Sequence, residues 1–364
     1  MTDLPSRMAA VLLTGHGGFD KLVWREDVAV PVPGPGEVLV RVGAAAVNNT
    51  DINTRVGWYS KAVTEGTNVG GGEGFAAAEA ADATWSGGAL AFPRIQGIDA
   101  CGRIVAVGPD VATSRLGERV LVEPCLRAPL GWAPWRAWYL GSECDGAFAQ
   151  FVKVPAEHAH AIASSLDDVA LASFPCAAST AENMLTRAAV ATGETVLVTG
   201  ASGGVGSAAV QLARARGARP VAVAGAAKEA ELRVAGAAGF VARGSSLVAA
   251  LGRDSVDAVI DVAAGPGWPE LLDVLRPGGR YAVAGAIAGP MVALDVRTLY
   301  LKDLTLHGCT CLGPGVFANL VRLIEQGAIR PMVAATFPLS EIVAAQTLFL
   351  AKTHVGKIVL IPPA

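Results

Sequence analysis

The residues best suited to chemistry form a glycine-rich turn, Gly200-Ala-Ser-Gly-Gly-Val-Gly206, between a β-branched run and a helix pattern of small residues. Backbone N–H groups in such a turn, with the positive end of the following helix, make a seat for a pyrophosphate. Apolar runs on both sides favour this interpretation over a flexible Gly/Ser linker. We therefore expect a dinucleotide site that uses Gly200, Ser202, Gly203, Gly204, Val205 and Gly206.

Strand and helix patterns alternate around this turn, which predicts an α/β domain with a doubly wound parallel sheet covered on both faces. The strand patterns lie at 196–199, 220–224, 240–242, 258–261 and 280–285. The helix patterns lie at 205–216, 228–235 and 269–275.

The first part of the chain has a different pattern, with short strand signals separated by turn residues. Strands are expected at 38–43, 97–107 and 117–123, which predicts a mostly antiparallel β domain. A last strand at 356–361 is expected to rejoin this domain. Two irregular stretches, 61–91 and 125–144, are either surface excursions packed by their own side chains or walls of a substrate cleft. The tryptophan-rich stretch 125–144 could also form an oligomer contact.

Composition narrows the class of protein. The 364 residues carry a net charge of −3 with no basic cluster, so we expect no nucleic-acid partner. No segment reaches the ~18 unbroken apolar residues that a membrane span requires. Six scattered cysteines fit reduced, buried thiols in a cytoplasmic protein better than a disulfide framework.

Four segments carry a family resemblance, and they occur in the same order as in that family. They are Val47–Tyr59 with its Asn-x-x-Asp and Gly-x-Tyr spacings, Gly97–Gly108, Asp145–Val152 and Gly356–Val359. With the glycine turn, they resemble the medium-chain dehydrogenase/reductase superfamily, and especially its zinc-free quinone oxidoreductases and enoyl reductases.

The resemblance implies two domains with an active site in the cleft between them. Residues 1–160 and 312–364 would form a GroES-like catalytic domain, and residues 161–311 a Rossmann domain. It also implies a homodimer joined through edge strands of the Rossmann sheets.

Zinc-dependent members of this superfamily hold a catalytic metal at three positions, which are Asn48, Ile98 and Cys176 here. Neither an amide nor an isoleucine replaces a thiolate or imidazole ligand, so we expect no metal. At the structural zinc lobe of those relatives this chain has only Cys125 and Cys144, and two thiols cannot close a tetrahedral site.

The cofactor is expected to be NADP(H). NAD-preferring sites place an acid at the end of the second strand, but here Gly225 follows that strand and the first carboxylate is Glu229. Lys228 would meet a 2′-phosphate, and Arg243 lies where similar NADPH-dependent reductases have a phosphate-contacting residue. The alternative is that both are ordinary solvated cations.

The resemblance places Tyr59 in the active site, where its hydroxyl could donate to a developing enolate or phenolate oxygen. Alternatively Tyr59 is a packing residue, and the neighbouring Trp58 faces the site. Two acids that recur in the family, Asp51 and Asp99, either order the hydrogen bonds of the site or end a strand.

Four further residues are implied to contact the nicotinamide end of the cofactor. Asn48, which we also count as catalytic, would hold the ribose, and Thr180 the nicotinamide. Gly285 and Ala286 would lie under the ring, where small residues allow close approach. For Asn48 and Thr180 the alternative is a local cap or turn hydrogen bond.

These expectations favour an oxidoreductase that transfers a hydride from NADPH to a quinone or an α,β-unsaturated carbonyl or enoyl substrate without a metal. One alternative is an alcohol or aldehyde dehydrogenase of the zinc-type branch. Another, from a different class, is a catalytically silent NADPH-binding or sensor protein. Fold alone cannot choose between them.

Overall fold

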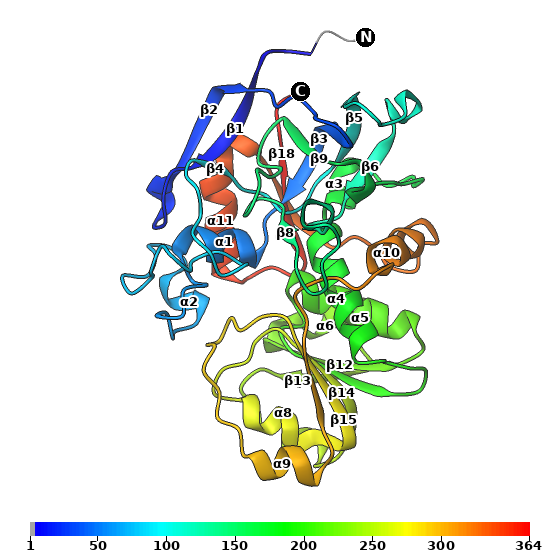
Figure 1. The fold of residues 1–364 in the computed structure, drawn as a ribbon. Helices are drawn as coiled ribbons and strands as arrows, with labels where there is room; N and C mark the ends of the chain where they lie inside the picture. The colour runs from blue at the N-terminus through cyan, green and yellow to red at the C-terminus, as the bar shows by residue number, and fades with distance from the viewer. Residues whose placement is uncertain (1–3) are drawn as a thin grey trace.

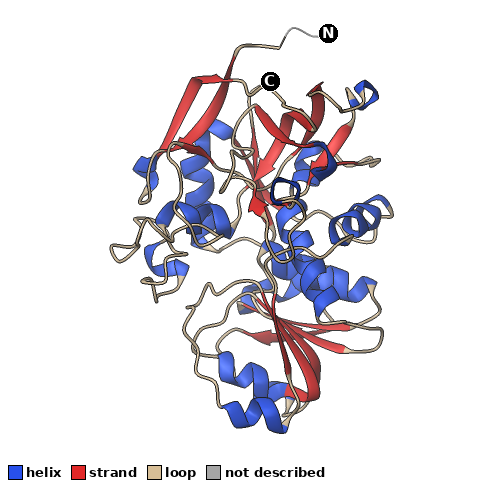
Figure 2. Cartoon of the chain, in the orientation of Figure 1, coloured by secondary structure: helices blue, strands red, loops and turns tan. Residues whose placement is uncertain are grey.

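A computed structural model describes residues 4–364 (Figure 1). The chain forms two parts, one built on antiparallel strands from both ends of the chain and one built on a parallel sheet. Figure 2 shows the strands of the parallel sheet fanned between helices, with long loops crossing the middle of the molecule.

The parallel sheet confirms the predicted α/β domain. Its six strands follow the order β13-β12-β11-β14-β15-β16, and every neighbouring pair is parallel. The strands are β11 (Thr195–Val198), β12 (Arg219–Ala224), β13 (Gly239–Ala242), β14 (Val256–Asp261), β15 (Leu275–Val283) and β16 (Thr305–Gly308). The strand order reverses direction between β11 and β14, and ligands of such sheets bind at the carboxyl ends beside this point.

Helices flank this sheet because each parallel strand needs a crossover connection. The three predicted helices are found as α5 (Gly204–Ala215), α6 (Glu229–Val234) and α8 (Trp268–Val274). The sequence did not predict the short α7 (Leu247–Leu251) and α9 (Val296–Leu301). Nor did it predict β16, whose four residues are mostly exposed and lack an apolar run.

The antiparallel part is centred on β3 (Glu37–Ala46), which pairs with β5, β9 and β18. The sheet order is β10-β6-β5-β3-β18-β17. The other strands are β5 (Cys101–Val107), β6 (Arg119–Val122), β9 (Phe151–Pro155), β10 (Ala159–Ala161), β17 (Val333–Pro338) and β18 (Lys357–Ile361). β18 pairs through Val359 with Ala46, so the last strand rejoins the first domain as predicted.

Smaller elements complete this part. Three strands, β1 (Arg7–Leu13), β2 (Leu22–Ala29) and β4 (Arg94–Ile95), form a second sheet, and β7 (Cys125–Leu126) pairs with β8 (Trp138–Tyr139). The remaining helices are α1 (Asn49–Val56), α2 (Thr67–Gly70), α3 (Asp168–Ala172), α4 (Pro175–Arg187), α10 (Val316–Glu325) and α11 (Ile342–Ala351). Short 3₁₀ turns lie at Phe19–Lys21, Thr113–Arg115, Ala128–Leu130, Ala156–His158, Ala226–Lys228 and Leu339–Glu341.

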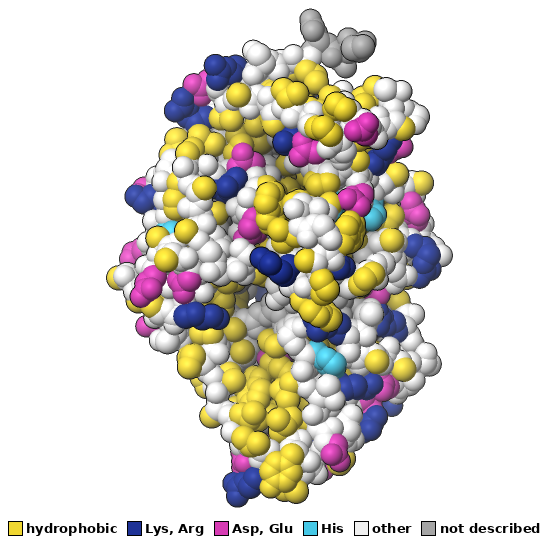
Figure 3. Space-filling view, viewed as in Figure 1, with side chains coloured by type: hydrophobic (Ala, Val, Ile, Leu, Met, Phe, Trp, Pro, Cys, Tyr) yellow, Lys and Arg dark blue, Asp and Glu magenta, His cyan; other side chains and the backbone are white. Residues whose placement is uncertain are grey.

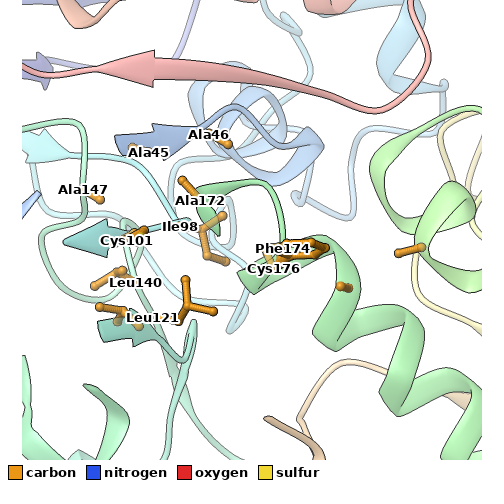
Figure 4. Packing of buried hydrophobic residues seen from close by; sticks show 14 of the residues in the cluster. Ala45, Ala46, Ile98, Cys101, Leu121, Leu140, Ala147, Ala172, Phe174 and Cys176 are labelled. Carbon is orange, nitrogen blue, oxygen red and sulfur yellow. The ribbon is translucent and has the colours of Figure 1, made fainter. Parts of the chain in front are cut away.

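A continuous apolar core joins the antiparallel sheet to the start of α4 (Figure 4). Ala45 and Ala46 of β3 are small and fully buried. They leave room for Ile98, which follows β4, and for Phe174 and Cys176 at the start of α4. α3 packs on β3 and β5, whereas α4 packs on α5, so the chain passes from one part to the other around these helices. Within residues 4–364, no helix has the length and apolar character needed to cross a membrane.

Candidate active site

Three buried polar side chains meet next to the start of α4, and each comes from a different segment. Asn48 is the N-cap of α1 directly after β3, Asp99 lies in the turn before β5, and Lys357 begins β18. The Nδ2 of Asn48 donates to Asp99 Oδ2 at 2.7 Å, and the Lys357 ammonium donates to the same oxygen at 2.8 Å and to Asn48 Oδ1 at 2.5 Å. The three side chains therefore form one network, called the polar triad below.

Asp99 has a further donor at the start of α4. Its Oδ1 accepts from the backbone N–H of Cys176 at 2.6 Å. The N-terminus of a helix carries partial positive charge, so it adds to the positive charge of Lys357. Although fully buried, the Asp99 carboxylate is thus compensated from two sides.

Asp51 lies one turn along α1 and is also buried. Its Oδ2 accepts from the backbone N–H of Asn48 at 2.7 Å and completes a capping box. Burial raises the pKa of Asp51 to about 7, and the negative charge of nearby Asp99 adds to this rise. Of the two interpretations from sequence, the structure shows Asp51 in a local ordering role and Asp99 inside the site.

The raised pKa of Asp51 predicts a pH-dependent stability. Between about pH 4 and pH 7 the folded chain keeps a proton on Asp51 that the unfolded chain releases, so stability falls as pH rises through this window. A rise of about 3 pKa units corresponds to about 4 kcal/mol. Urea unfolding from pH 4 to pH 8 should show this slope, and Asp51→Asn should flatten it, while Glu157→Gln on the surface should not. An unchanged slope in Asp51→Asn would refute this assignment.

The three positions expected from zinc-type relatives do not fit a zinc ion. The amide of Asn48 is held by Asp99 and Lys357, which puts an ammonium group beside the first position. Ile98 is a buried aliphatic side chain without a donor atom, which leaves Cys176 as the only usual zinc ligand of the three. Across residues 4–364, no three His, Cys, Asp or Glu side chains are grouped so that they could hold a metal ion.

Tyr59 lies in the turn after α1 and forms part of an aromatic wall. Its hydroxyl donates to Thr50 Oγ1 at 3.0 Å, and burial raises its pKa, so the group is a proton donor at neutral pH. The Tyr59 ring stacks on Trp85 with centroids 6.1 Å apart, and Trp85 stacks on Tyr139 at 4.3 Å. We call Tyr59, Trp85 and Tyr139 the aromatic wall. Trp58 instead donates its indole N–H to the Glu65 carbonyl.

The two irregular stretches, 61–91 and 125–144, meet each other at the aromatic wall. Trp85 comes from 61–91 and Tyr139 from 125–144, so the stretches meet each other beside Tyr59. Arg55 of α1 anchors the first stretch, because its buried guanidinium donates to the carbonyls of Gly71 and Gly17 at 2.7 Å. The first stretch is therefore ordered by specific contacts with α1, and the second stretch contacts the first through Tyr139 and Trp85.

The glycine turn has the geometry of a phosphate cradle. Gly200 has φ +55°, and Gly203 is the N-cap of α5. A Cβ on Gly206 would lie 2.3 Å from the Gly200 carbonyl oxygen, so only glycine lets α5 begin this close to β11. Free N–H groups at the start of this twelve-residue helix suit a pyrophosphate, and the cradle fits the dinucleotide expected from sequence.

The strand that supplies Lys357 also touches the glycine turn. The backbone N–H of Gly356 donates to the Ser202 carbonyl at 2.9 Å. A Cβ on Gly204 would lie 2.8 Å from Lys357 Cδ, so the lysine side chain passes directly over the start of α5. β18 therefore connects the polar triad to the cradle, and Val205 lies half-buried in the first turn of α5.

The other predicted cofactor residues lie at the carboxyl edge of the sheet or near it. Gly225 follows β12, Arg243 follows β13, and Gly285 and Ala286 lie just past β15, which ends at Val283 rather than Gly285. Thr180 lies on α4, one turn after Cys176, and its hydroxyl contacts the thiol of Cys176. Gly225, Arg243, Gly285 and Ala286 therefore lie after the carboxyl ends of β12, β13 and β15.

Lys228 belongs to a basic cluster that sequence reasoning did not find. Its ammonium donates to the carbonyl of Thr353, between Lys352 and His354. Burial lowers the pKa of Lys352 to about 7, and burial together with nearby lysines lowers that of His354 to about 4. We call Lys228, Lys352 and His354 the basic cluster. No local sequence signal joins residues more than a hundred positions apart.

Lys357 was also missed as a site residue. It belongs to the Gly-Lys-Ile-Val segment that carried the resemblance, but the motif did not assign it a role. Its importance follows from burial, since a fully buried lysine is rare unless it is paired.

Two family descriptions match this chain. The "Alcohol dehydrogenase GroES-like domain" matches residues 34–164, and the "Zinc-binding dehydrogenase" family matches residues 204–326. An acryloyl-coenzyme A reductase from Metallosphaera sedula is 30% identical over 97% of this chain and 99% of its own length. The chain belongs to the medium-chain dehydrogenase/reductase superfamily. A quinone oxidoreductase from Lama guanicoe is 27% identical over 97% of both chains.

Solved structures of this superfamily agree with the fold. The crystal structure of a candidate alcohol dehydrogenase from Sinorhizobium meliloti 1021 is 47% identical, covers 100% of this chain and 99% of its own, and has a TM-score of 0.88. A crotonyl-CoA carboxylase/reductase in complex with NADP is 26% identical, with a TM-score of 0.80 over 98% of this chain and 95% of its own. The chain is thus an oxidoreductase with a GroES-like domain and a nicotinamide cofactor-binding Rossmann domain.

Proposed function

We propose that this oxidoreductase reduces a quinone or an α,β-unsaturated carbonyl or enoyl substrate with NADPH and without a metal. The observation that carries the proposal is the polar triad, which puts the Lys357 ammonium beside the positions where zinc-type relatives hold their metal. Relatives described as acryloyl-coenzyme A reductase and quinone oxidoreductase, aligned over nearly the whole chain, support the same substrate classes. Both substrate classes accept a hydride at an electron-poor carbon.

The cofactor, when bound, supplies the hydride. The glycine turn and the start of α5 would hold its pyrophosphate, and Gly285 and Ala286 would leave room for the nicotinamide. Both N–H groups of the Asn48 amide are used, on Asp99 and on the Ala46 carbonyl, so Asn48 can hold a ribose hydroxyl only through its Oδ1 as acceptor. Thr180, beside Cys176, would position the nicotinamide.

Tyr59 would act on the substrate oxygen. When a carbonyl becomes an enolate, or a quinone a phenolate, negative charge develops on oxygen and requires a donor. The Tyr59 hydroxyl is protonated at neutral pH and already donates to a neighbouring oxygen on Thr50. It would turn from Thr50 to the substrate and supply the product's proton.

NADP(H) is favoured over NAD(H) by charge at the end of β12. No carboxylate lies between the end of β12 and Glu229, while the basic cluster brings Lys228, Lys352 and His354 together, with lowered pKa values for Lys352 and His354. A dianionic phosphate would compensate the positive charges of Lys228 and of the buried Lys352. Arg243 at the end of β13 would provide a further cation.

We predict that Lys352→Ala weakens NADPH binding about tenfold and leaves NADH binding within about twofold, because a lost charge–phosphate contact is worth roughly 1–2 kcal/mol. Fluorescence titration of both cofactors measures this. The matched control Lys153→Ala, on a distant ion pair with Glu37, should change neither. Equal losses for both cofactors would place Lys352 outside a 2′-phosphate site, and tighter binding of NADH by the wild type would refute the NADP(H) proposal.

An alcohol or aldehyde dehydrogenase is the second candidate, since the Sinorhizobium protein at 47% identity is described as an alcohol dehydrogenase. Elemental analysis separates the two: the proposal expects far less than one zinc per chain, whereas the zinc-type reaction needs a full equivalent. The Lys357 ammonium donates to Asn48 Oδ1, and this contact favours far less than one zinc per chain.

We infer that two copies pair along β16, one of the two edge strands of the parallel sheet. Apolar side chains gather over this domain (Figure 3), and Met291, Tyr300 and Leu301 are exposed by 59–70%. An exposed apolar patch beside an open strand edge is typical of an interface.

Leu301→Glu should therefore halve the mass measured by light scattering, because a buried charge opposes the interface. Val234→Glu, at a residue 90% exposed on α6, is the matched control and should stay dimeric. A monomeric wild type would contradict the inference.

A further inference from the structure

Two cysteine thiols from different domains face each other. Cys125 lies in β7 of the GroES-like domain, and Cys311 lies between β16 and α10, where the chain leaves the parallel sheet. Their sulfur atoms are 3.8 Å apart, although 186 residues separate them in sequence. Both side chains are buried, with 2% and 6% exposure.

The backbone holds both residues in place. Cys125 pairs with Tyr139 in the β7–β8 ladder. The Cys311 carbonyl accepts from Asn183 Nδ2 at 3.2 Å, and Asn183 Oδ1 in turn accepts from the N–H of Gly313 at 3.1 Å. The facing thiols are therefore a fixed feature of the domain boundary, and only a small movement would bring them to bonding distance.

The surroundings make one of the two sulfurs a nucleophile. The hydrogen bond between the two thiols, with the positive charges of Arg127 and Arg187, lowers the pKa of Cys311, while that of Cys125 rises. A thiolate beside a thiol is the arrangement in which a sulfenic acid is resolved to a disulfide.

The other thiols lack this arrangement. Cys309, two residues away, donates to the His307 carbonyl, and burial raises the pKa of Cys101, Cys144 and Cys176. Of the described cysteines, only Cys125 and Cys311 contact each other. Cys309 is close to Cys311 in sequence, but the structure places Cys125 against Cys311.

We propose that Cys125 and Cys311 form a reversible disulfide, a modification site that joins the two domains under peroxide. The Cys311 thiolate attacks one peroxide oxygen, the O–O bond breaks, and the departing hydroxide takes a proton to give water. Cys125 gives up its proton, its sulfur bonds to the Cys311 sulfur, and the sulfenic oxygen leaves as a second water. Two thiols and one hydrogen peroxide thus give one disulfide and two waters. A dithiol reductant reverses the step.

The bond would join the aromatic wall to the Rossmann domain. Tyr139 belongs to that wall and pairs directly with Cys125, and Cys311 is anchored on α4 through Asn183. The closed loop would contain the whole parallel sheet. This inference rests on the two domains and their contact, not on the proposed substrate or cofactor.

The test treats the folded wild-type chain with hydrogen peroxide and counts thiols after denaturation. Six free thiols should fall to four, a peptide pair containing Cys125 and Cys311 should appear by mass spectrometry without reductant, and dithiothreitol should restore all six. The matched variant Cys309→Ser should give the same cross-linked pair. Cys311→Ser should abolish it.

Three results would overturn the proposal. One is retention of all six thiols, another is a bond that joins either cysteine to a different partner, and the third is separate oxidation of both sulfurs without a bond. Because the wild-type chain alone gives these results, a poorly folded variant does not affect the test.

Discussion

Replacement of Tyr59 by Phe should lower kcat about 100-fold with an enoyl thioester or quinone acceptor, and leave the dissociation constant for NADPH unchanged. Loss of one donor to a developing oxyanion typically costs a factor of about 10²–10³ in kcat. The Phe ring keeps the stacking on Trp85, so only the hydroxyl and its hydrogen bond to Thr50 are lost. Steady-state NADPH oxidation at 340 nm, with separate cofactor titration, measures the two quantities.

The matched control is Tyr300→Phe, which removes a hydroxyl from an exposed residue on α9 and should leave kcat unchanged. If Tyr59→Phe kept more than half of the wild-type kcat, Tyr59 would be a packing residue of the aromatic wall. A raised NADPH dissociation constant would instead place its role in cofactor binding.

Lys357→Met should destabilise the chain by about 3–5 kcal/mol, because removal of one partner leaves a buried charge without compensation. Asp99 would keep only the amide of Asn48 and the N–H of Cys176 as donors. Methionine preserves most of the stem that passes over Gly204, so the loss reports the ammonium group.

A double-mutant cycle with Asp99→Asn tests whether this loss comes from the ion pair. The double variant should be clearly more stable than the sum of the two single losses predicts, since it removes both charges together. Additive losses in urea unfolding would show that Lys357 and Asp99 are not energetically linked.

The sequence predicted the two domains because their patterns are local and physical. β11 to β14 and the end of β15 contain short apolar runs, helix patterns lie between most of them, and the final strand has the apolar character needed to pair with β3. The glycine turn was also predictable, since Gly206 is required by a close approach that only glycine permits.

Long-range contacts could not be predicted in this way. Lys357 joins Asn48 across 309 positions, and Lys228 reaches the carbonyl of Thr353 across 125. Hydrophobic periodicity places a residue on a strand or helix but does not say which distant side chain it will meet. For the same reason, the sequence does not show that the Cys125 thiol lies beside the Cys311 thiol.

Other expectations were limited by ambiguous local signals. Trp58 and Tyr59 are adjacent aromatics, and only the structure shows that Trp58 donates to the Glu65 carbonyl while Tyr59 stacks on Trp85. The short β16 lacks a buried face, so its position at the sheet edge depends on pairing with β15 alone.

The most direct test of the central claim is NADPH oxidation by protein that has been dialysed against a chelator and analysed for metals. We expect turnover with 9,10-phenanthrenequinone or crotonyl-coenzyme A at undiminished rate, with zinc far below one equivalent per chain. Activity that vanishes with the metal and returns with zinc would contradict the account of the polar triad. Cofactor binding without any turnover would instead identify a silent NADPH-binding protein.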